Sequence, residues 1–324
     1  MVKSMEAVYQ SQEQKRKWGI KKSTRERLVK DFKRYWMIYA LAVPVLIYFF
    51  VFNYVPMGGL VMAFQDYSPR KGILGSTWVG LKNFQDFFSS YYFIRTLRNT
   101  FTISVLDIVV TFPAAIILAL LLNEVGNKKV KKVVQTVSYM PYFISTVVAA
   151  TLLIDFCKTN GVFNEIIVFF GGERSNLLGD PSLFQPLYVL SNLWQKVGYN
   201  SIIYMAALSS VDQSLYEAAT VDGAGRWKQT LHVTLPSISS TIMITLILRM
   251  GAIMSVGFEK IILLYSPTTY ETADIISSFT YRRGLVEADY GFSTAVGLFN
   301  SVINTVILLA VNKISSKVSE TQLF

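Results

Sequence analysis

The sequence has one cysteine and one histidine among its 324 residues, and charged residues account for only 16% of the chain. A single thiol cannot form a disulfide within the chain, and Cys157 with His232 cannot supply the usual clusters of zinc ligands. The same scarcity removes the usual Ser-His and Cys-His nucleophile pairs, so we expect no catalytic residues, no metal site and no bound cofactor. Soluble domains average roughly 25% charged residues, so this deficit indicates that lipid is the solvent.

Hydrophobic residues make up 52% of the chain, and they gather in long runs. A transmembrane helix needs about 20 mostly apolar residues, because each residue advances a helix by roughly 1.5 Å. The fourth run is the least apolar, since it contains Asn192, Gln195, Lys196 and Asn200. The runs predict an all-α membrane protein with six transmembrane helices, at about residues 36–62, 97–122, 133–157, 185–210, 237–258 and 291–312.

Basic residues gather in segments that alternate with the predicted spans. Residues 1–35 hold eleven Lys and Arg against four Asp and Glu, and residues 127–132 read NKKVKK. Because Lys and Arg near span ends favour the cytoplasmic side, we expect both termini in the cytoplasm. The chain then divides into a basic N-terminal tail with an interfacial helix (1–35), a transmembrane domain (36–312) and a short C-terminal tail (313–324). We assign the basic tail to membrane lipid and not to nucleic acid, because no aromatic-basic binding module accompanies it.

The loop between the predicted fourth and fifth spans, residues 211–236, is polar and rich in helix formers. We expect a capping box of Ser210 and Gln213 to begin one short helix, and Gly223 to allow a turn before a second. Pro236 biases Leu235 toward an extended conformation and can open the fifth span. Helices this short are unstable alone in water, and the loop carries apolar side chains that a solvated connector does not need. We therefore favour docking on another protein over a simple connection between two spans.

A motif in this loop resembles that of a known family. Glu-Ala-Ala, three residues, Gly, nine residues and Val-x-Leu-Pro matches the EAA loop of type I ABC importer permeases at every position. Residues 80–84, GLKNF, are similar to an element in the first external segment of the sugar and polysaccharide branch. The resemblance implies the type I permease fold, with a cytoplasmic helix-turn-helix coupling loop that fits a cleft in an ATPase subunit. The coupling residues that it implies are Glu217, Ala218, Ala219, Asp222, Gly223, Arg226, Leu235 and Pro236.

The same resemblance implies a function and a set of partners. The chain would be the multi-pass permease subunit of an ATP-driven ABC importer in the bacterial cytoplasmic (inner) membrane. It would take up an oligo- or polysaccharide, acidic ones such as alginate included, delivered by a soluble periplasmic or extracellular binding protein. A second permease, homologous in a heterodimer or identical, would pair with it, and two ATPase subunits would hold ATP and Mg. The sequence contains no G-x-x-x-x-G-K-[ST], in agreement with ATP hydrolysis on a separate chain.

Polar side chains within the predicted spans fall on single helix faces. A charge at the centre of a span costs roughly 2.5–3.5 kcal/mol to insert, so each needs a partner or water. Hydrogen bonding between packed helices is one explanation, which we favour for the second and third spans, and Asp107 could pair with Lys196 or Arg249. The mixture of Lys, Asn, Tyr and Trp in the fourth span equally suits a wall for a hydroxyl-rich ligand, whose charge Lys196 and Arg249 would screen. The predicted pathway residues are Asn192, Trp194, Lys196, Tyr199, Asn200, Arg249, Asn300 and Asn304.

The alternative function is a secondary transporter or channel driven by an ion gradient. It predicts inverted repeats and acidic ion sites within the spans. No internal repeat is evident, and Asp107 and Asp155 are the only carboxylates near membrane depth in the predicted spans. The alternative also leaves the EAA motif unexplained.

Overall fold

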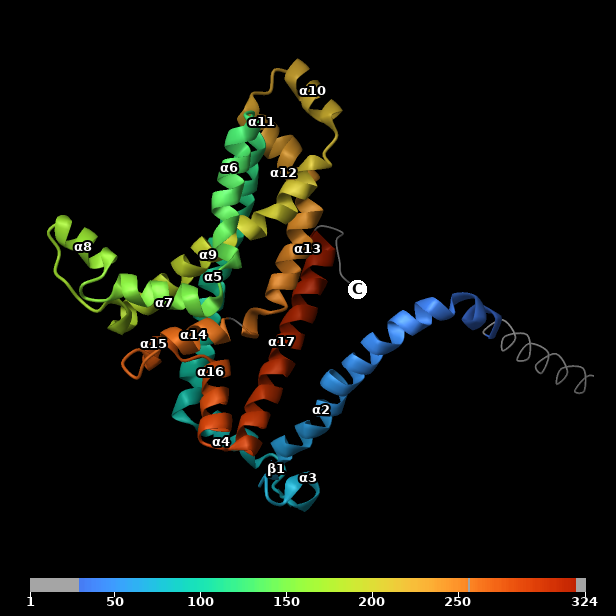
Figure 1. The fold of residues 1–324 in the computed structure, drawn as a ribbon, viewed down its shortest axis with the longest axis vertical. Helices are drawn as coiled ribbons and strands as arrows, with labels where there is room; N and C mark the ends of the chain where they lie inside the picture. Colours follow the sequence, from blue (N-terminus) through green and yellow to red (C-terminus); the bar gives the residue numbers. More distant parts are fainter. Residues whose placement is uncertain (1–28, 256, 319–324) are drawn as a thin grey trace, which may run out of the picture. The chain divides into compact units, whose positions relative to one another are not determined.

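A computed structural model describes residues 29–255 and 257–318, with side chains described as far as Ser315 (Figure 1). Residues 1–28, which hold most of the predicted basic tail, and residues 319–324 lie outside the described residues. The described part of the chain is almost entirely helical, which confirms the predicted all-α membrane fold.

The first structural unit ends at Val61, and its described residues belong to one long apolar helix, which ends at Phe64. This helix, Val29–Phe64, covers the first predicted span, and its 36 residues are enough to cross a bilayer. It includes the π-helical turn η1 (Phe50–Tyr54), α2 (Val55–Met57) and the 3₁₀ turn η2 (Gly58–Phe64). The widened π-helical turn precedes a proline in α2, which has no backbone N–H to donate along the helix.

The second unit, from Met62 onward, contains the helices that cover the second, fourth and sixth predicted spans. These are α5 (Tyr91–Glu124), α9 (Pro181–Ser209) and α17 (Tyr290–Val318). α5 and α9 pack against each other, and α13 (Ser239–Met250) packs against α17 (Figure 1). Two helix pairs therefore organise this unit.

The third predicted span, residues 133–157, is not one helix, so its predicted bounds were wrong. α6 (Lys128–Tyr139) ends in the 3₁₀ turn η3 (Met140–Phe143), and α7 (Thr146–Cys157) begins after it. The proline in η3 lacks the N–H that a continuous helix would donate at this point. The segment long and apolar enough to cross a membrane is Thr146–Phe169, which adds α8 (Val162–Phe169) to α7.

By length and composition, four helices of the described residues could cross a membrane, or five if one bent pair counts as a single span. The bent pair is Arg226–Ser237 and Ser239–Met250, which meet at 61° and include most of the fifth predicted span. α9 does not meet these criteria, although it is 29 residues long, because of its polar residues. All six predicted runs are thus largely helical, and the polar face of α9 needs protein or water beside it.

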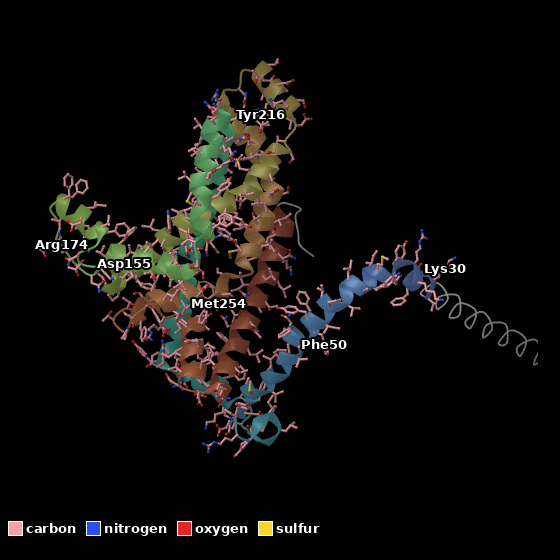
Figure 2. The ribbon with its side chains drawn as sticks, viewed as in Figure 1. Lys30, Phe50, Asp155, Arg174, Tyr216 and Met254 are labelled. Carbon is pink, nitrogen blue, oxygen red and sulfur yellow. The ribbon has the colours of Figure 1, made fainter. Side chains whose placement is uncertain are left out.

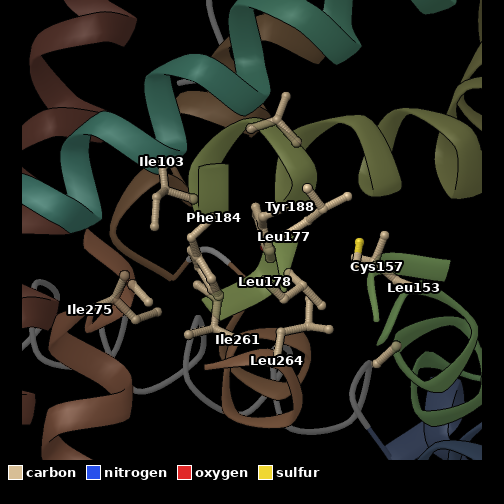
Figure 3. Packing of buried hydrophobic residues seen from close by; sticks show 13 residues of the cluster. Ile103, Leu153, Cys157, Leu177, Leu178, Phe184, Tyr188, Ile261, Leu264 and Ile275 are labelled. Atoms are coloured by element: carbon tan, nitrogen blue, oxygen red, sulfur yellow. The ribbon is translucent and has the colours of Figure 1, made fainter. Parts of the chain in front are cut away.

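The core between α5, α7 and α9 is built of large apolar side chains (Figure 3). Phe184 and Tyr188 of α9 are fully buried with Ile103 of α5 and with Ile261 of α14 (Phe258–Leu264). Cys157 is also fully buried in this cluster, where it acts as a small apolar side chain. The cluster fixes α14 against the middle of the unit.

The segment that follows the first span forms a small hairpin. β1 (Gln65–Asp66) pairs antiparallel with β2 (Thr77–Trp78). Asn83 of the GLKNF element donates its side-chain amide to the carbonyl oxygens of Ala63 and Gln65, at 2.9 and 3.1 Å. The asparagine of this element therefore closes the hairpin.

Asp274, between α15 (Tyr270–Ala273) and α16 (Ile276–Tyr281), is completely buried. Its carboxylate accepts hydrogen bonds from Arg282 at 2.6 Å and from Arg95 of α5 at 3.2 Å. Buried charge is tolerated when it is paired in this way, so the cluster fixes the segment after α14 to the start of α5. The remaining short elements outside the EAA loop are α3 (Gly72–Gly75), α4 (Lys82–Ser89), η4 (Leu177–Gly179), η6 (Ile253–Ser255) and η7 (Arg282–Val286).

Candidate functional site

The EAA loop begins with α10 (Gln213–Val221), whose N-cap is Asp212 and not the predicted Ser210. The Asp212 carboxylate accepts a hydrogen bond from the backbone N–H of Ser214 at 2.9 Å. This backbone bond is the main cause that holds the pKa of Asp212 below its usual value. Ser210 belongs to the end of α9, where its hydroxyl donates to the carbonyl of Ala207. The capping-box prediction was therefore wrong, because Asp212, which is as good an N-cap as serine, lies directly before the helix, two residues after Ser210.

The predicted turn between two short helices is confirmed. Gly223 has φ of +73°, a left-handed conformation that other residues adopt only at a cost, and α11 (Arg226–Gln229) starts three residues later. The side-chain amide of Gln229 donates hydrogen bonds to the carbonyl of Ala224 at 2.9 Å and to the hydroxyl of Thr220 at 3.0 Å. These bonds hold the two helices as one compact helix-turn-helix.

Leu235 is helical, with φ of −61° and ψ of −45°, so its predicted extended conformation was wrong. The chain runs from α11 through the π-helical turn η5 (Thr230–Thr234) into α12 (Leu235–Ser237). Pro236 occupies the first turn of α12, where its missing N–H is tolerated. The break follows at Ile238, where the chain bends by 61° into α13. The EAA loop is thus connected to α13 through nearly continuous helix.

The EAA loop presents a largely exposed surface at one end of the second unit, near Tyr216 in Figure 2. Of the predicted coupling residues, Ala219 and Leu235 are half-buried and the others are exposed; these are Glu217, Ala218, Asp222, Gly223, Arg226 and Pro236. Val221 and Trp227 are large apolar side chains that are 88% and 74% exposed. Exposed apolar side chains beside charged ones are typical of a protein interaction surface.

The EAA loop also contacts the end of α5. Arg226 lies 3.7 Å from the carboxylate of Glu124, the last residue of α5. Within the loop, Tyr216 of α10 and Thr234 of η5 share a hydrogen bond of 3.0 Å between their hydroxyls. A cavity of about 470 Å³ lies between α10, η5 and the end of α5, with Glu217 and Glu124 in its lining. The arrangement permits a partner to contact the loop and the end of α5 together.

A second polar region lies in the middle of the long helices. Arg249 of α13 lies 3.7 Å from the carboxylate of Asp107 on α5 and donates to the hydroxyl of Thr111 at 2.8 Å. Of the two predicted partners of Asp107, the structure therefore selects Arg249. Asn192 of α9 donates its amide to the other oxygen of Asp107 at 3.0 Å. These contacts join α5, α9 and α13 through one carboxylate.

Lys260 is the residue of this region that the sequence analysis missed. It follows the predicted fifth span and was not among the predicted pathway residues, but it is only 4% exposed and donates to Asn192 at 3.0 Å and to Gln195 at 3.3 Å. Its neighbours gave a signal, since in FEKIILLY the lysine is followed directly by four aliphatic residues. Such a stretch folds as a buried helix, here α14, and carries the lysine inward.

The predicted pathway residues fall into separate groups. Lys196 and Asn192 line a cavity of about 510 Å³ with Lys260, whereas Tyr199, Asn200 and Arg249 line a neighbouring cavity of about 450 Å³. Trp194 is half-exposed on α9 and lines neither cavity.

The aromatic ring of Tyr142 lies at the boundary between these groups. Tyr142 lines the first cavity, and its ring stacks on that of Tyr199 with centroids 3.7 Å apart and planes within 4°. The two stacked rings therefore join the linings of the two cavities.

Asn300 and Asn304 of α17 have a packing role in the structure. Asn304 accepts from the backbone N–H of Met254 at 3.3 Å and donates to the carbonyl of Gly251, and Asn300 donates to the carbonyl of Met254 at 3.3 Å. Met254 lies in η6, the break that follows α13 (Figure 2). The two amides satisfy the backbone groups that this break leaves without helical partners.

A family model for the inner membrane component of binding-protein-dependent transport systems matches residues 111–320. The chain belongs to this family. The family predicted from the EAA motif is therefore confirmed, and the chain is a membrane permease component of a transport system. The matched residues include the EAA loop, α9, α13 and α17.

Relatives of known name cover nearly the whole chain. The polygalacturonan/rhamnogalacturonan transport system permease protein YteP of Bacillus subtilis (strain 168) is 43% identical over 94% of this chain and 95% of its own length. Protein LplB of the same organism is 42% identical over 90% of this chain and 92% of its own length. These matches confirm a sugar-transport permease relationship.

Two crystal structures share the fold. A chain of a bacterial ABC transporter involved in the import of the acidic polysaccharide alginate is 46% identical, with a TM-score of 0.84 over 90% of this chain and 99% of that one. A chain of the bacterial alginate ABC transporter in complex with an alginate pentasaccharide-bound periplasmic protein is 45% identical. Its TM-score is 0.85 over 92% of this chain and all of that one. The predicted type I importer permease fold is thereby confirmed.

Proposed function

We propose that this permease imports fragments of an acidic polysaccharide that a soluble binding protein delivers. The observation that carries the proposal is similarity over nearly the full length to permeases named for two such polymers, polygalacturonan/rhamnogalacturonan and alginate. Both polymers carry carboxylates on their sugar rings, and the described pathway region holds Lys196 and Lys260, beside Arg249, which pairs with Asp107. Cations in a water-filled path lower the cost of moving carboxylates through a membrane.

The proposal includes partners that supply the energy and complete the pathway. Two ATPase subunits, which hold ATP and Mg, bind the EAA loops of this permease and of a second permease. The exposed Val221, Trp227 and Glu217 offer an apolar and charged surface suited to such an interface. The second permease is a homologue or an identical chain, and both termini of this chain face the cytoplasm with the EAA loop.

The route from the EAA loop to the pathway follows the helices. Movement of α10 and α11 is transmitted through η5 and α12 to the bend at Ile238, and from there to α13. α13 carries Arg249, which is paired with Asp107 of α5. A rigid shift of this kind can change which side of the membrane the cavities face, because packed helices move as bodies.

The ATPase partnership is tested by affinity purification from the native membrane. We compare the wild type with Glu217→Arg, and with Glu173→Arg as a control that makes the same change at an exposed residue outside the EAA loop. An ATPase and a second permease should co-purify with the wild type and the control, and the ATPase should be lost from Glu217→Arg. If no ATPase accompanies the wild type in mild detergent, the importer proposal fails and gradient-driven transport takes its place.

The substrate class is tested by uptake into proteoliposomes that contain the complete transporter. Binding protein and ATP are supplied, and labelled oligouronates are compared with neutral oligosaccharides of equal length. Uptake should require ATP and binding protein and should favour the oligouronates. Uptake of neutral sugars alone would reject the acidic substrate and retain the permease assignment.

The orientation is tested by thiol labelling. Cys157 is buried, and Cys157→Ser removes it so that a single exposed cysteine can be placed in the EAA loop as Lys228→Cys. A membrane-impermeant reagent should label this position only in inverted vesicles. Labelling in intact cells would contradict a cytoplasmic loop.

A further inference from the structure

The cavity of about 510 Å³ lies between α9, α14 and the break that separates α6 from α7. Four of its polar lining residues are deeply buried: Tyr188, Asn192, Gln195 and Lys260 are between 0% and 6% exposed. Lys196, also in the lining, is half-buried. Several buried polar groups that converge on one cavity are typical of a ligand site.

The two lysines of this cavity have no carboxylate partner among the described residues. The ion pairs in that part of the chain include neither Lys196 nor Lys260. Asp107 is occupied by Arg249 and by Asn192, and Glu259, which also lines the cavity, is exposed. The lining therefore carries a net positive charge, and a buried cation without an anion is costly.

The ammonium group of Lys260 also has one N–H donor without an acceptor among the described residues. An ammonium donates three hydrogen bonds, and two of them reach the neutral oxygens of Asn192 and Gln195. An acceptor that enters the cavity could take the third. A carboxylate is the acceptor that would also offset the charge.

Tyr188 provides a second, independent indication of a ligand. The residue is fully buried, and its hydroxyl has no hydrogen-bond partner in the described part of the chain. The hydroxyl lies against Gly257, where φ is +48° and where a Cβ atom would overlap it. Tyr188 and Gly257 both belong to the lining of the cavity, and a buried hydroxyl without a partner indicates a missing partner group.

We propose that this cavity binds one uronic acid unit of the substrate during transport. The sugar carboxylate binds Lys260 and Lys196, a sugar hydroxyl pairs with Tyr188, and the sugar ring stacks on Tyr142. The inference rests on the proposed function and adds to it the place where the acidic group is recognised. Arg249, by contrast, is a structural cation, because Asp107 already neutralises it.

The test measures binding to the complete transporter, purified in detergent without its binding protein. The probes are a labelled uronic acid trisaccharide and the same trisaccharide with its carboxyl groups reduced to alcohols. The variants are Lys196→Gln, Lys260→Gln and Tyr188→Phe, and the control is Lys128→Gln, which removes an exposed lysine outside the cavity. ATPase activity without substrate shows that each variant is folded.

Either lysine variant should bind the acidic trisaccharide about tenfold more weakly, since charge-assisted hydrogen bonds are strong, and should bind the reduced one within twofold of wild type. Tyr188→Phe should weaken both probes by a similar factor, and the control should change neither. If Lys260→Gln does not fold, Lys196→Gln decides the question. Equal loss of both probes in the lysine variants, or no binding by the wild type, overturns this inference. Uptake of oligouronates by the wild type would still support the proposed function.

Discussion

Arg249 at the end of α13 lies 3.7 Å from the carboxylate of Asp107 in the middle of α5, and both side chains are mostly buried. Removal of one partner leaves the other charge buried without compensation. We expect Asp107→Leu to destabilise the protein by about 3 kcal/mol, measured as a lower midpoint of thermal unfolding in detergent. The double variant Asp107→Leu with Arg249→Leu should recover most of this loss. A double variant as unstable as the single one would show that the pair itself is not the cause.

Asp274 gives a second test of buried charge, at the segment after α14. Its carboxylate is completely buried and is the shared acceptor of Arg282 and Arg95. Asp274→Asn removes the negative charge from between two guanidiniums and should cost about 3 kcal/mol by the same measurement.

The matched control for Asp274 is Asp289→Asn. Asp289 also pairs with an arginine, Arg283 at 3.0 Å, but its side chain is 40% exposed. Pairs that remain in contact with water contribute little, so the midpoint should hardly move. Similar shifts in the two variants would contradict the role assigned to burial.

Gly198 allows α9 to approach the end of α6 closely. A Cβ atom at this position would overlap the backbone of Ser138, which cannot move aside like a flexible side chain. Gly198→Ala should therefore destabilise the protein by about 1–3 kcal/mol, the usual cost of overpacking. Gly297→Ala in α17 is the control, because its Cβ would meet no atom within 4 Å. Equal midpoints of thermal unfolding for Gly198→Ala and Gly297→Ala would refute the prediction.

The helices could be predicted well because long apolar runs act locally, except in the third span, where the break at the proline of η3 was not predicted. The EAA loop could be predicted in the same way, since its glycine turn and short helices depend on neighbours in sequence. Errors arose where two local rules competed. Asp212 displaced Ser210 as N-cap, and Pro236 entered the first turn of a helix, a position that tolerates its missing N–H.

The polar centre could be predicted only in part, because partners distant in sequence decide what each side chain does. Asp107 was expected to pair with one of two cations, and helix packing chose Arg249. Lys260 was missed because its depth depends on α14 folding back against α9. Asn300 and Asn304 matched a polar-face pattern, but the break after α13 that they stabilise is not visible in the sequence.

The N-cap of α10 predicts a pH dependence in the EAA loop. The pKa of Asp212 is lowered in the folded loop, so its contribution to stability is present above its unfolded pKa, about 3.9, and is lost as pH falls through the folded pKa. Hydrogen exchange of residues 214–221 should be faster in Asp212→Ala than in wild type at pH 7. This difference should shrink below about pH 4. Asp212→Asn keeps an acceptor oxygen and should stay close to wild type at neutral pH. If the difference in exchange rate between Asp212→Ala and wild type were constant from pH 7 to pH 3, the capping bond would not depend on the charge of Asp212.

Two glycines of the EAA loop, two residues apart, differ in backbone conformation but not in the space around them. Alanine substitutions at the two positions therefore distinguish the effect of backbone strain from the effect of added volume. Gly223 has φ of +73°, whereas Gly225 has φ of −68°, and a Cβ atom at either would meet nothing within 4 Å. Alanine at Gly223 must adopt the left-handed conformation at a cost of about 1–2 kcal/mol, or the turn must change. Alanine at Gly225 has no such cost. We expect Gly223→Ala to weaken association with the ATPase by about fivefold or more and Gly225→Ala to leave it within twofold, measured on purified subunits in detergent. Equal weakening would mean that the ATPase surface leaves no room for a methyl group at either site, and that the turn geometry is not what positions Glu217.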